Sequence, residues 1–158
     1  APRRRLEALS ELSQRGIPTG VMVAPLIPGL NDRDVPGVLE AARTAGAQWA
    51  GMTLLRLPGP VKQVFFERLE EALPLRYKRV VSRLTDARGE DLHGKHFFER
   101  FRGHGPYFEA VEQLFLLTCR RLGLGTGRGV EKLEYSSERR SPFRRPEQPG
   151  RQLLLFDL

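Results

Sequence analysis

Arg56 is the residue whose chemistry stands out first, because it interrupts the apolar run MTLLRL at residues 52–57. An arginine is rarely buried unless its charge is paired. If the run is a strand, a guanidinium at its carboxyl end can hold a carboxylate or a phosphate through two parallel hydrogen bonds. The position therefore predicts an anion-binding arginine, with a structural ion pair to a helix carboxylate as the alternative.

Backbone groups form the second candidate site, within the stretch GIPTGVMVAPLIPGLND at residues 16–32. Residues 19–24 are mostly small or β-branched and apolar, which is typical of a strand buried on both faces of a parallel sheet. The prolines and glycine that follow end the strand, and peptide groups that the sheet no longer uses can bond a ligand. Ligands of parallel α/β folds lie at this end of a strand. We therefore expect ligand contacts from Val23, Ala24, Pro25 and Asn31, with an ordinary strand-to-helix turn as the alternative.

Histidine and cysteine do not complete a metal site in this sequence. His93, His96 and His104 lie among glycines, and Cys119 is the single cysteine. Since a zinc site needs a fuller set of ligands, we expect no metal bound by these histidines. One cysteine excludes an internal disulfide and favours a reducing compartment, so we expect a cytoplasmic protein.

Positive charge exceeds negative charge along the chain, with 26 lysines and arginines against 19 aspartates and glutamates, a net charge of +7. Such an excess favours polyanionic partners such as DNA, although a basic solvated surface is the plain alternative. The segment KHFFERFRGHGPY at residues 95–107 interleaves basic and aromatic side chains that can meet phosphates and bases. We favour the alternative that its phenylalanines fill the core. No run is long enough to span a membrane.

The last residues, RQLLLFDL at 151–158, turn abruptly apolar after a stretch rich in Gly, Ser, Pro, Arg and Glu. That stretch, residues 123–150, is typical of a disordered linker. The pentapeptide QLLLF resembles the bacterial sliding-clamp-binding motif Q-L-x-L-F. Its partner-binding residues would be Gln152, Leu153, Leu155 and Phe156, with docking of the tail on its own domain as the alternative.

The elements that position these residues follow from apolar spacing. We expect helices at residues 2–14, 61–72, 77–89 and 106–122, and a further helix that begins near Asp32 or Asp34 and ends at Gly46. Strands are expected at residues 19–24 and 47–57. A strand, a helix and a strand form a parallel unit. Two parallel strands alone need neighbours on their edges and helices on their faces, so we expect the chain to be one part of a larger α/β protein.

Residues 16–47, the run GMTLLRLPGPVKQVF and the run HGKHFFERFRGHGPYFEAVEQLFLLTCRRLGL resemble a bacterial radical SAM family related to spore photoproduct lyase. The resemblance covers about residues 2–124 and depends on the order and wording of these runs. It implies a partial (β/α) barrel, a [4Fe–4S] cluster held by three cysteines spaced C-x3-C-x2-C, and S-adenosylmethionine (SAM) as cofactor. Val23, Ala24, Pro25 and Asn31 would lie near the adenine and ribose of SAM, and Arg56 near its carboxylate.

The departure from this family is as informative as the resemblance, since the three cysteines are absent and Cys119 stands alone. The fold class expected is therefore α/β, the C-terminal part of a partial radical SAM barrel, with residues 1–122 as barrel and helices. Residues 123–150 would be the linker and residues 151–158 the tail. Such a chain would be inactive without an N-terminal half that carries the cluster, and we expect neither SAM nor the cluster to be bound by this chain alone. The alternative is a non-catalytic module recruited to the sliding clamp.

Overall fold

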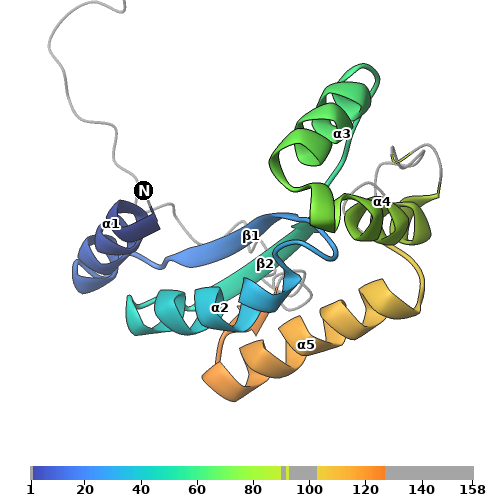
Figure 1. Ribbon diagram of the computed structural model, residues 1–158. Coiled ribbons are helices and arrows are strands. Elements are labelled where there is room, and N and C mark those ends of the chain that lie inside the picture. The colour runs from blue at the N-terminus through green and yellow to red at the C-terminus, as the bar shows by residue number, and fades with distance from the viewer. Residues whose placement is uncertain (1, 90–91, 93–102, 127–158) are drawn as a thin grey trace, which may run out of the picture.

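The computed structural model describes residues 2–89, 92 and 103–126, and these form an α/β arrangement around a small parallel sheet (Figure 1). The predicted α/β class is thereby confirmed. No helix within the described residues is both long and apolar enough to cross a membrane.

The sheet contains β1 (Gly20–Leu26), β2 (Trp49–Leu54) and β3 (Gly125–Thr126), in the order β1-β2-β3. All neighbouring strands are parallel. The β1–β2 register runs from Gly20 opposite Trp49 to Leu26 opposite Leu54 and is irregular between Val23 and Leu26. As an outer strand, β1 has no described strand on its other edge.

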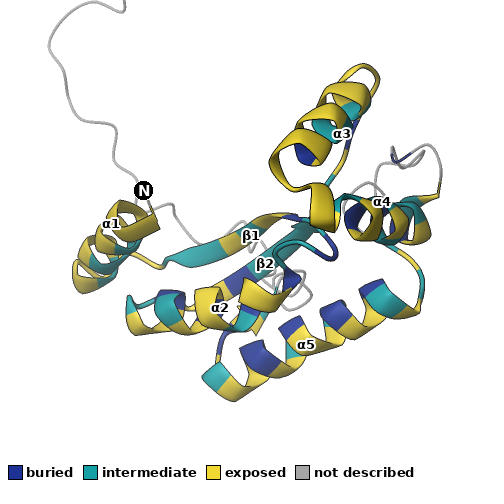
Figure 2. Ribbon diagram, in the orientation of Figure 1, coloured by how far each residue is buried: buried dark blue, intermediate teal, exposed yellow. Residues whose placement is uncertain are grey.

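One layer of helices lies beside the sheet. The connection from β1 to β2 contains the short 3-10 helix η1 (Asp32–Asp34) and α2 (Val35–Thr44), and α2 packs on β1 and on α5 (Pro106–Leu122) (Figure 1). The buried apolar residues are Val35, Leu39 and Ala42 on α2 and Phe108, Val111, Phe115 and Cys119 on α5. Val38 and Leu114, which have the same helical spacing, are instead 40% and 41% exposed. Figure 2 shows this buried stripe facing inward on both helices.

The first helix, α1 (Pro2–Gln14), is less well covered than its sequence suggests. None of its residues is buried, and Leu12 is 42% exposed even though Leu6, Leu9 and Leu12 form an apolar face. Its clearest tie to the remaining fold is the Ser13 hydroxyl, which donates to the Gly46 carbonyl oxygen at 3.2 Å. An apolar helix face with so little cover indicates that this side of the fold is open.

Helices α3 (Val61–Ala72) and α4 (Pro74–Arg88) follow β2 as a pair joined at Leu73. Phe66 contacts both Phe65 and Tyr77 edge to face, which ties the two helices together. Val80, Leu84 and Ala87 bury the inner face of α4. The helix ends at Gly89, whose φ of 75° suits glycine.

Several boundaries differ from the prediction, among them the start of α4, which lies at Pro74 rather than residue 77. The first strand extends to Leu26, two residues past the expected end, and the second ends at Leu54 rather than residue 57. The third strand, β3, was not predicted and lies inside residues 123–150, the range assigned to a linker. Gly123 turns the chain in the left-handed region, Leu124 is buried, and the Gly125 N–H donates to the Gln48 carbonyl oxygen at 2.9 Å. Residues 123–126 therefore belong to the fold; the remaining linker and the tail lie outside the described residues.

Candidate functional site

The loop that leaves β1 is held in shape by Asn31. Its side-chain oxygen accepts from the Ile27 N–H at 2.7 Å, and its amide nitrogen donates to the Pro25 carbonyl oxygen at 3.0 Å. One bond lies within the loop and the other reaches back to Pro25 near the end of β1, so Asn31 holds the loop against the strand that it leaves. The predicted ligand contact of Asn31 stays a prediction, and the structure adds a second role, in which its side chain shapes the loop.

Val23, Ala24 and Pro25 lie where a ligand could reach the backbone of β1. Ala24 and Pro25 are exposed and fall in the irregular stretch between the Val23–Met52 and Leu26–Leu54 pairs. The Pro25 carbonyl oxygen already accepts from the Asn31 amide and proline has no N–H, so the peptide group of Ala24, outside the paired positions of β1 and β2, is the one that a ligand could contact.

Arg56 lies beside this stretch and is exposed, two residues past the end of β2 at Leu54, so the expectation that the strand continues to residue 57 was wrong. The Leu55 N–H donates to the Leu26 carbonyl oxygen at 2.8 Å, which holds the first residue after β2 against the last residue of β1. The chain turns outward after Leu54 because prolines and a glycine follow. Arg56 and the Ala24–Pro25 backbone are thus brought to one edge of the sheet.

A second arginine, Arg88 at the end of α4, reaches the same edge and was not predicted. Its Nε donates to the Leu55 carbonyl oxygen at 2.7 Å and its Nη2 to the Leu54 carbonyl oxygen at 2.9 Å. Burial, and then the nearby positive charge of Arg56, lower the pKa of Arg88. The two guanidinium groups are therefore close enough for their positive charges to interact. In the sequence, the one indication of this role is that Arg88 comes at the end of a predicted helix, just before Gly89.

A polar cluster occupies the carboxyl end of β1, around the buried Asp32. The Asp32 carboxylate accepts from the Gly29 N–H at 3.0 Å, from the Arg33 N–H at 3.1 Å and from the Tyr107 hydroxyl. Burial raises the pKa of Tyr107, and the hydrogen bond to Asp32 and its charge raise it further. The Arg83 guanidinium lies 3.9 Å from the centre of the Tyr107 ring.

This cluster joins the loop after β1 to α4 and α5. From the sequence, we expected Asp32 only as a helix cap. No side-chain cap bond is formed at the start of η1 or α2. Asp32 fastens the loop instead, since its carboxylate bonds the Gly29 and Arg33 amides and the Tyr107 hydroxyl. The signal available was an aspartate that follows a Pro-Gly turn, which is a frequent loop-fastening position.

Metal chemistry finds no support in the part of the chain that the structure describes, where no three His, Cys, Asp or Glu side chains gather. Cys119 is fully buried, and burial raises the pKa of its thiol. His104 is exposed and is held through its backbone, which donates to the Ala87 carbonyl oxygen at 2.8 Å. His93 and His96 lie outside the described residues, as do most of residues 95–107 and the tail residues Gln152, Leu153, Leu155 and Phe156.

Comparisons with protein-family models, curated proteins and solved structures gave no match to this chain. The radical SAM resemblance therefore stays a prediction.

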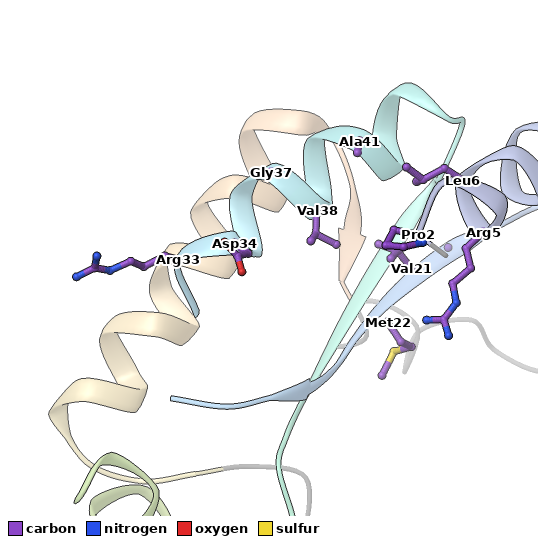
Figure 3. A pocket seen from close by; sticks show the side chains of 11 residues that line it. Pro2, Arg5, Leu6, Val21, Met22, Arg33, Asp34, Gly37, Val38 and Ala41 are labelled. Carbon is purple, nitrogen blue, oxygen red and sulfur yellow. The ribbon is translucent and has the colours of Figure 1, made fainter. Parts of the chain in front are cut away.

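A hollow with a volume of about 890 Å³ lies along the outer edge of β1, the edge opposite β2 (Figure 3). Its walls are Pro2, Arg5 and Leu6 of α1, Gly20 to Met22 of β1, and residues of η1 and α2 that include Val38. Val38 is 40% exposed and Met22 49% exposed, so the lining carries exposed apolar side chains, together with the charged Arg5, Arg33 and Asp34. This groove follows a strand edge and lies away from the arginine pair, so it has the position of a neighbouring chain segment more than of a small ligand.

Proposed function

We propose that this chain is the SAM-binding C-terminal part of a radical SAM enzyme related to spore photoproduct lyase. The observation that supports the proposal is the arginine pair, Arg56 and Arg88, beside the Ala24–Pro25 backbone at the carboxyl end of parallel strands. A cationic pair and available peptide groups suit the two ends of SAM, a carboxylate and a nucleoside.

The donor set fits SAM and does not fit the iron–sulfur cluster. Arg56, whose side chain is exposed, would hold the carboxylate, while Arg88 is anchored on the carbonyls of Leu54 and Leu55 and adds positive charge. A [4Fe–4S] cluster needs several thiolates, and this sequence has one cysteine, which is buried as a thiol. In the proposal the cluster ligands come from a separate polypeptide segment, and SAM supplies the radical used for hydrogen abstraction.

The groove beside β1 supports the need for such a segment. Strands of a parallel sheet are normally covered by neighbours on both edges. Among the described residues, β1 has a neighbouring strand on its β2 edge only. In the proposal, the segment that carries the cysteines adds its strand along this groove. α1 would then cover its apolar face of Leu6, Leu9 and Leu12 against that strand.

The test compares two ligands by isothermal titration calorimetry on the full chain. SAM carries the carboxylate and 5′-methylthioadenosine does not. We expect Arg56→Gln to weaken SAM binding by roughly tenfold or more, the usual effect of losing a charge-assisted contact, and to leave methylthioadenosine binding unchanged.

Arg4→Gln on the exposed face of α1 is the matched control, because it removes the same charge at a position away from the carboxyl ends of the strands. Equal loss for both ligands, equal loss in the control, or no SAM binding at millimolar concentration would reject the proposal.

The second candidate function depends on the tail alone, where QLLLF matches the clamp-binding pattern. A short extended segment of this kind inserts its apolar side chains into preformed pockets, while the glutamine fixes the register. We expect the full chain to bind the bacterial sliding clamp in a surface plasmon resonance assay. Gln152→Ala with Phe156→Ala should abolish binding, and Leu154→Ala, at the variable position of the motif, should not. Binding that survives the double substitution would exclude the motif.

A further inference from the structure

A row of arginines runs along one flank of α4. Arg76, Arg79 and Arg83, here called the α4 arginine stripe, are spaced three and four residues apart and therefore share a helix face. Arg76 and Arg79 are exposed and Arg83 is half-buried. The buried residues of the helix, Val80, Leu84 and Ala87, keep the inner face in the core, so the stripe is held at the surface by packing of the helix itself.

The stripe is not neutralised by its surroundings. None of its three arginines lies within ion-pair distance of a carboxylate among the described residues, whereas Arg3, Arg15, Arg68 and Arg121 each have an acidic partner. The sequence of α4 contains five basic residues and a single acidic residue, Asp86. An unbalanced row of this kind creates a local positive potential that attracts a polyanion.

The stripe also borders the carboxyl end of β1. Gly29 lies against it, since a Cβ at Gly29 would be 3.4 Å from Arg79 Cγ and 3.6 Å from Arg83 Cγ. Arg83 in turn lies on the Tyr107 ring, which fixes the direction of its guanidinium. A molecule held by the stripe would therefore pass the same edge that carries the exposed Ala24–Pro25 backbone.

The spacing of the charges indicates the chemical class of the partner. Neighbouring side chains on one helix face are about 5–6 Å apart, which gives a regular line of positive charge. Guanidinium groups bind phosphates through two parallel hydrogen bonds, and a nucleic-acid strand offers phosphates in a regular line. An acidic peptide presents carboxylates at irregular intervals. A membrane surface would need several apolar anchors beside the arginines, and α4 offers one large exposed apolar side chain, Leu75, which is 99% exposed.

We propose that the α4 arginine stripe binds the phosphate backbone of a nucleic acid and holds it beside the carboxyl edge of β1. This inference deepens the proposed function, because it gives the substrate class of the same edge of the sheet. Its test needs neither SAM nor a cluster, so its outcome is separate from the outcome of the SAM titration.

The test is fluorescence anisotropy of a labelled DNA duplex, and of one of its strands, with the full chain at two salt concentrations. Binding should weaken steeply between about 50 and 200 mM salt, as phosphate contacts require. Arg76→Gln with Arg79→Gln should weaken binding about tenfold or more at the lower salt and reduce the salt slope by about two. Arg83 is left in place because it packs on Tyr107.

Two matched variants separate the stripe from overall charge. Arg4→Gln with Arg120→Gln removes the same charge from exposed positions of α1 and α5 and should change affinity much less. Arg76→Lys with Arg79→Lys retains the charge and should retain most of the binding and its salt slope. Circular dichroism of each variant shows that the helices are retained.

Three outcomes would overturn the inference. They are no DNA binding at low salt, equal weakening by the stripe variant and by the Arg4–Arg120 control, and equal competition by poly-glutamate. Binding to phosphatidylglycerol vesicles without binding to DNA would assign the stripe to a membrane surface instead, and so would also overturn it.

Discussion

Tyr107 and Asp32 show how one hydrogen bond can link three parts of the fold. The hydroxyl of Tyr107, on α5, donates to the carboxylate of Asp32, at the start of η1, and its ring supports Arg83 of α4. Because Asp32 also binds the Gly29 amide, a change at Tyr107 acts on the loop that leaves β1. The cluster therefore sets the shape of the proposed site without touching its ligand.

This bond gives the stability of the protein a definite pH dependence. The pKa of Tyr107 in the folded state is raised above its ordinary value of 10.0, so the folded state holds this proton more tightly than the unfolded state. The resulting stabilisation is fully present below pH 10 and is lost as the pH rises through the raised pKa. We expect the free energy of unfolding of the wild type to fall more steeply above pH 10 than that of Tyr107→Phe.

Urea unfolding of both proteins between neutral pH and pH 11 measures this difference, and Tyr77→Phe is the matched control because Tyr77 packs edge to face with no hydroxyl bond among the described residues. Near neutral pH, Tyr107→Phe should be less stable by roughly 1–3 kcal/mol, since it leaves the buried Asp32 carboxylate short of one donor. Parallel pH curves for wild type and Tyr107→Phe would contradict the assigned bond.

At the scale of elements, the sheet is built around large side chains that lie over glycines. Trp49 of β2 is paired with Gly20 of β1 and with Gly125 of β3, and Met22 of β1 is paired with Gly51 of β2. A Cβ on Gly20 would be 2.1 Å from the Trp49 ring, and one on Gly51 would be 2.3 Å from Met22 Sδ. The glycines thus let two bulky residues lie flat on the sheet.

The Trp49 arrangement can be tested by its own fluorescence, because the chain has one tryptophan. In Gly20→Ala the indole must lift off β1, so we expect a red-shifted emission and a loss of roughly 1–3 kcal/mol in unfolding free energy. Gly37→Ala in α2 is the control, since a Cβ there meets nothing within 4 Å and helix propensity favours alanine. An unshifted emission in Gly20→Ala would contradict the packing of Trp49 on Gly20.

Sequence patterns predicted the helices and the two longer strands because each contains several apolar residues at a helical or strand spacing. The pattern failed where structure depends on distant contacts. β3 has two residues, Gly125 and Thr126, and forms because α5 returns the chain to β2. Arg88 is an ordinary helical arginine in the sequence, and only the packing of α4 places it on the carbonyls that follow β2.

At the scale of the whole molecule, the site could be predicted by its place but not by its members. The rule that ligands lie at the carboxyl ends of parallel strands selected the region of Pro25 and Arg56, and the structure brings both to that edge. The same rule could not assign roles within the edge. Asn31 serves the loop, and Arg88 and Tyr107 come from helices far along the chain.

The outer edge of β1 has a further consequence for the self-association of this protein. A strand flank without a described neighbour presents alternating donors and acceptors, and such a flank serves as a template for any extended peptide. Whether the protein assembles specifically or aggregates therefore depends on which segment pairs with this edge first. Co-expression with the proposed cysteine-bearing segment would then compete with pairing between two copies of this chain, and the yield of monodisperse protein would depend on that competition.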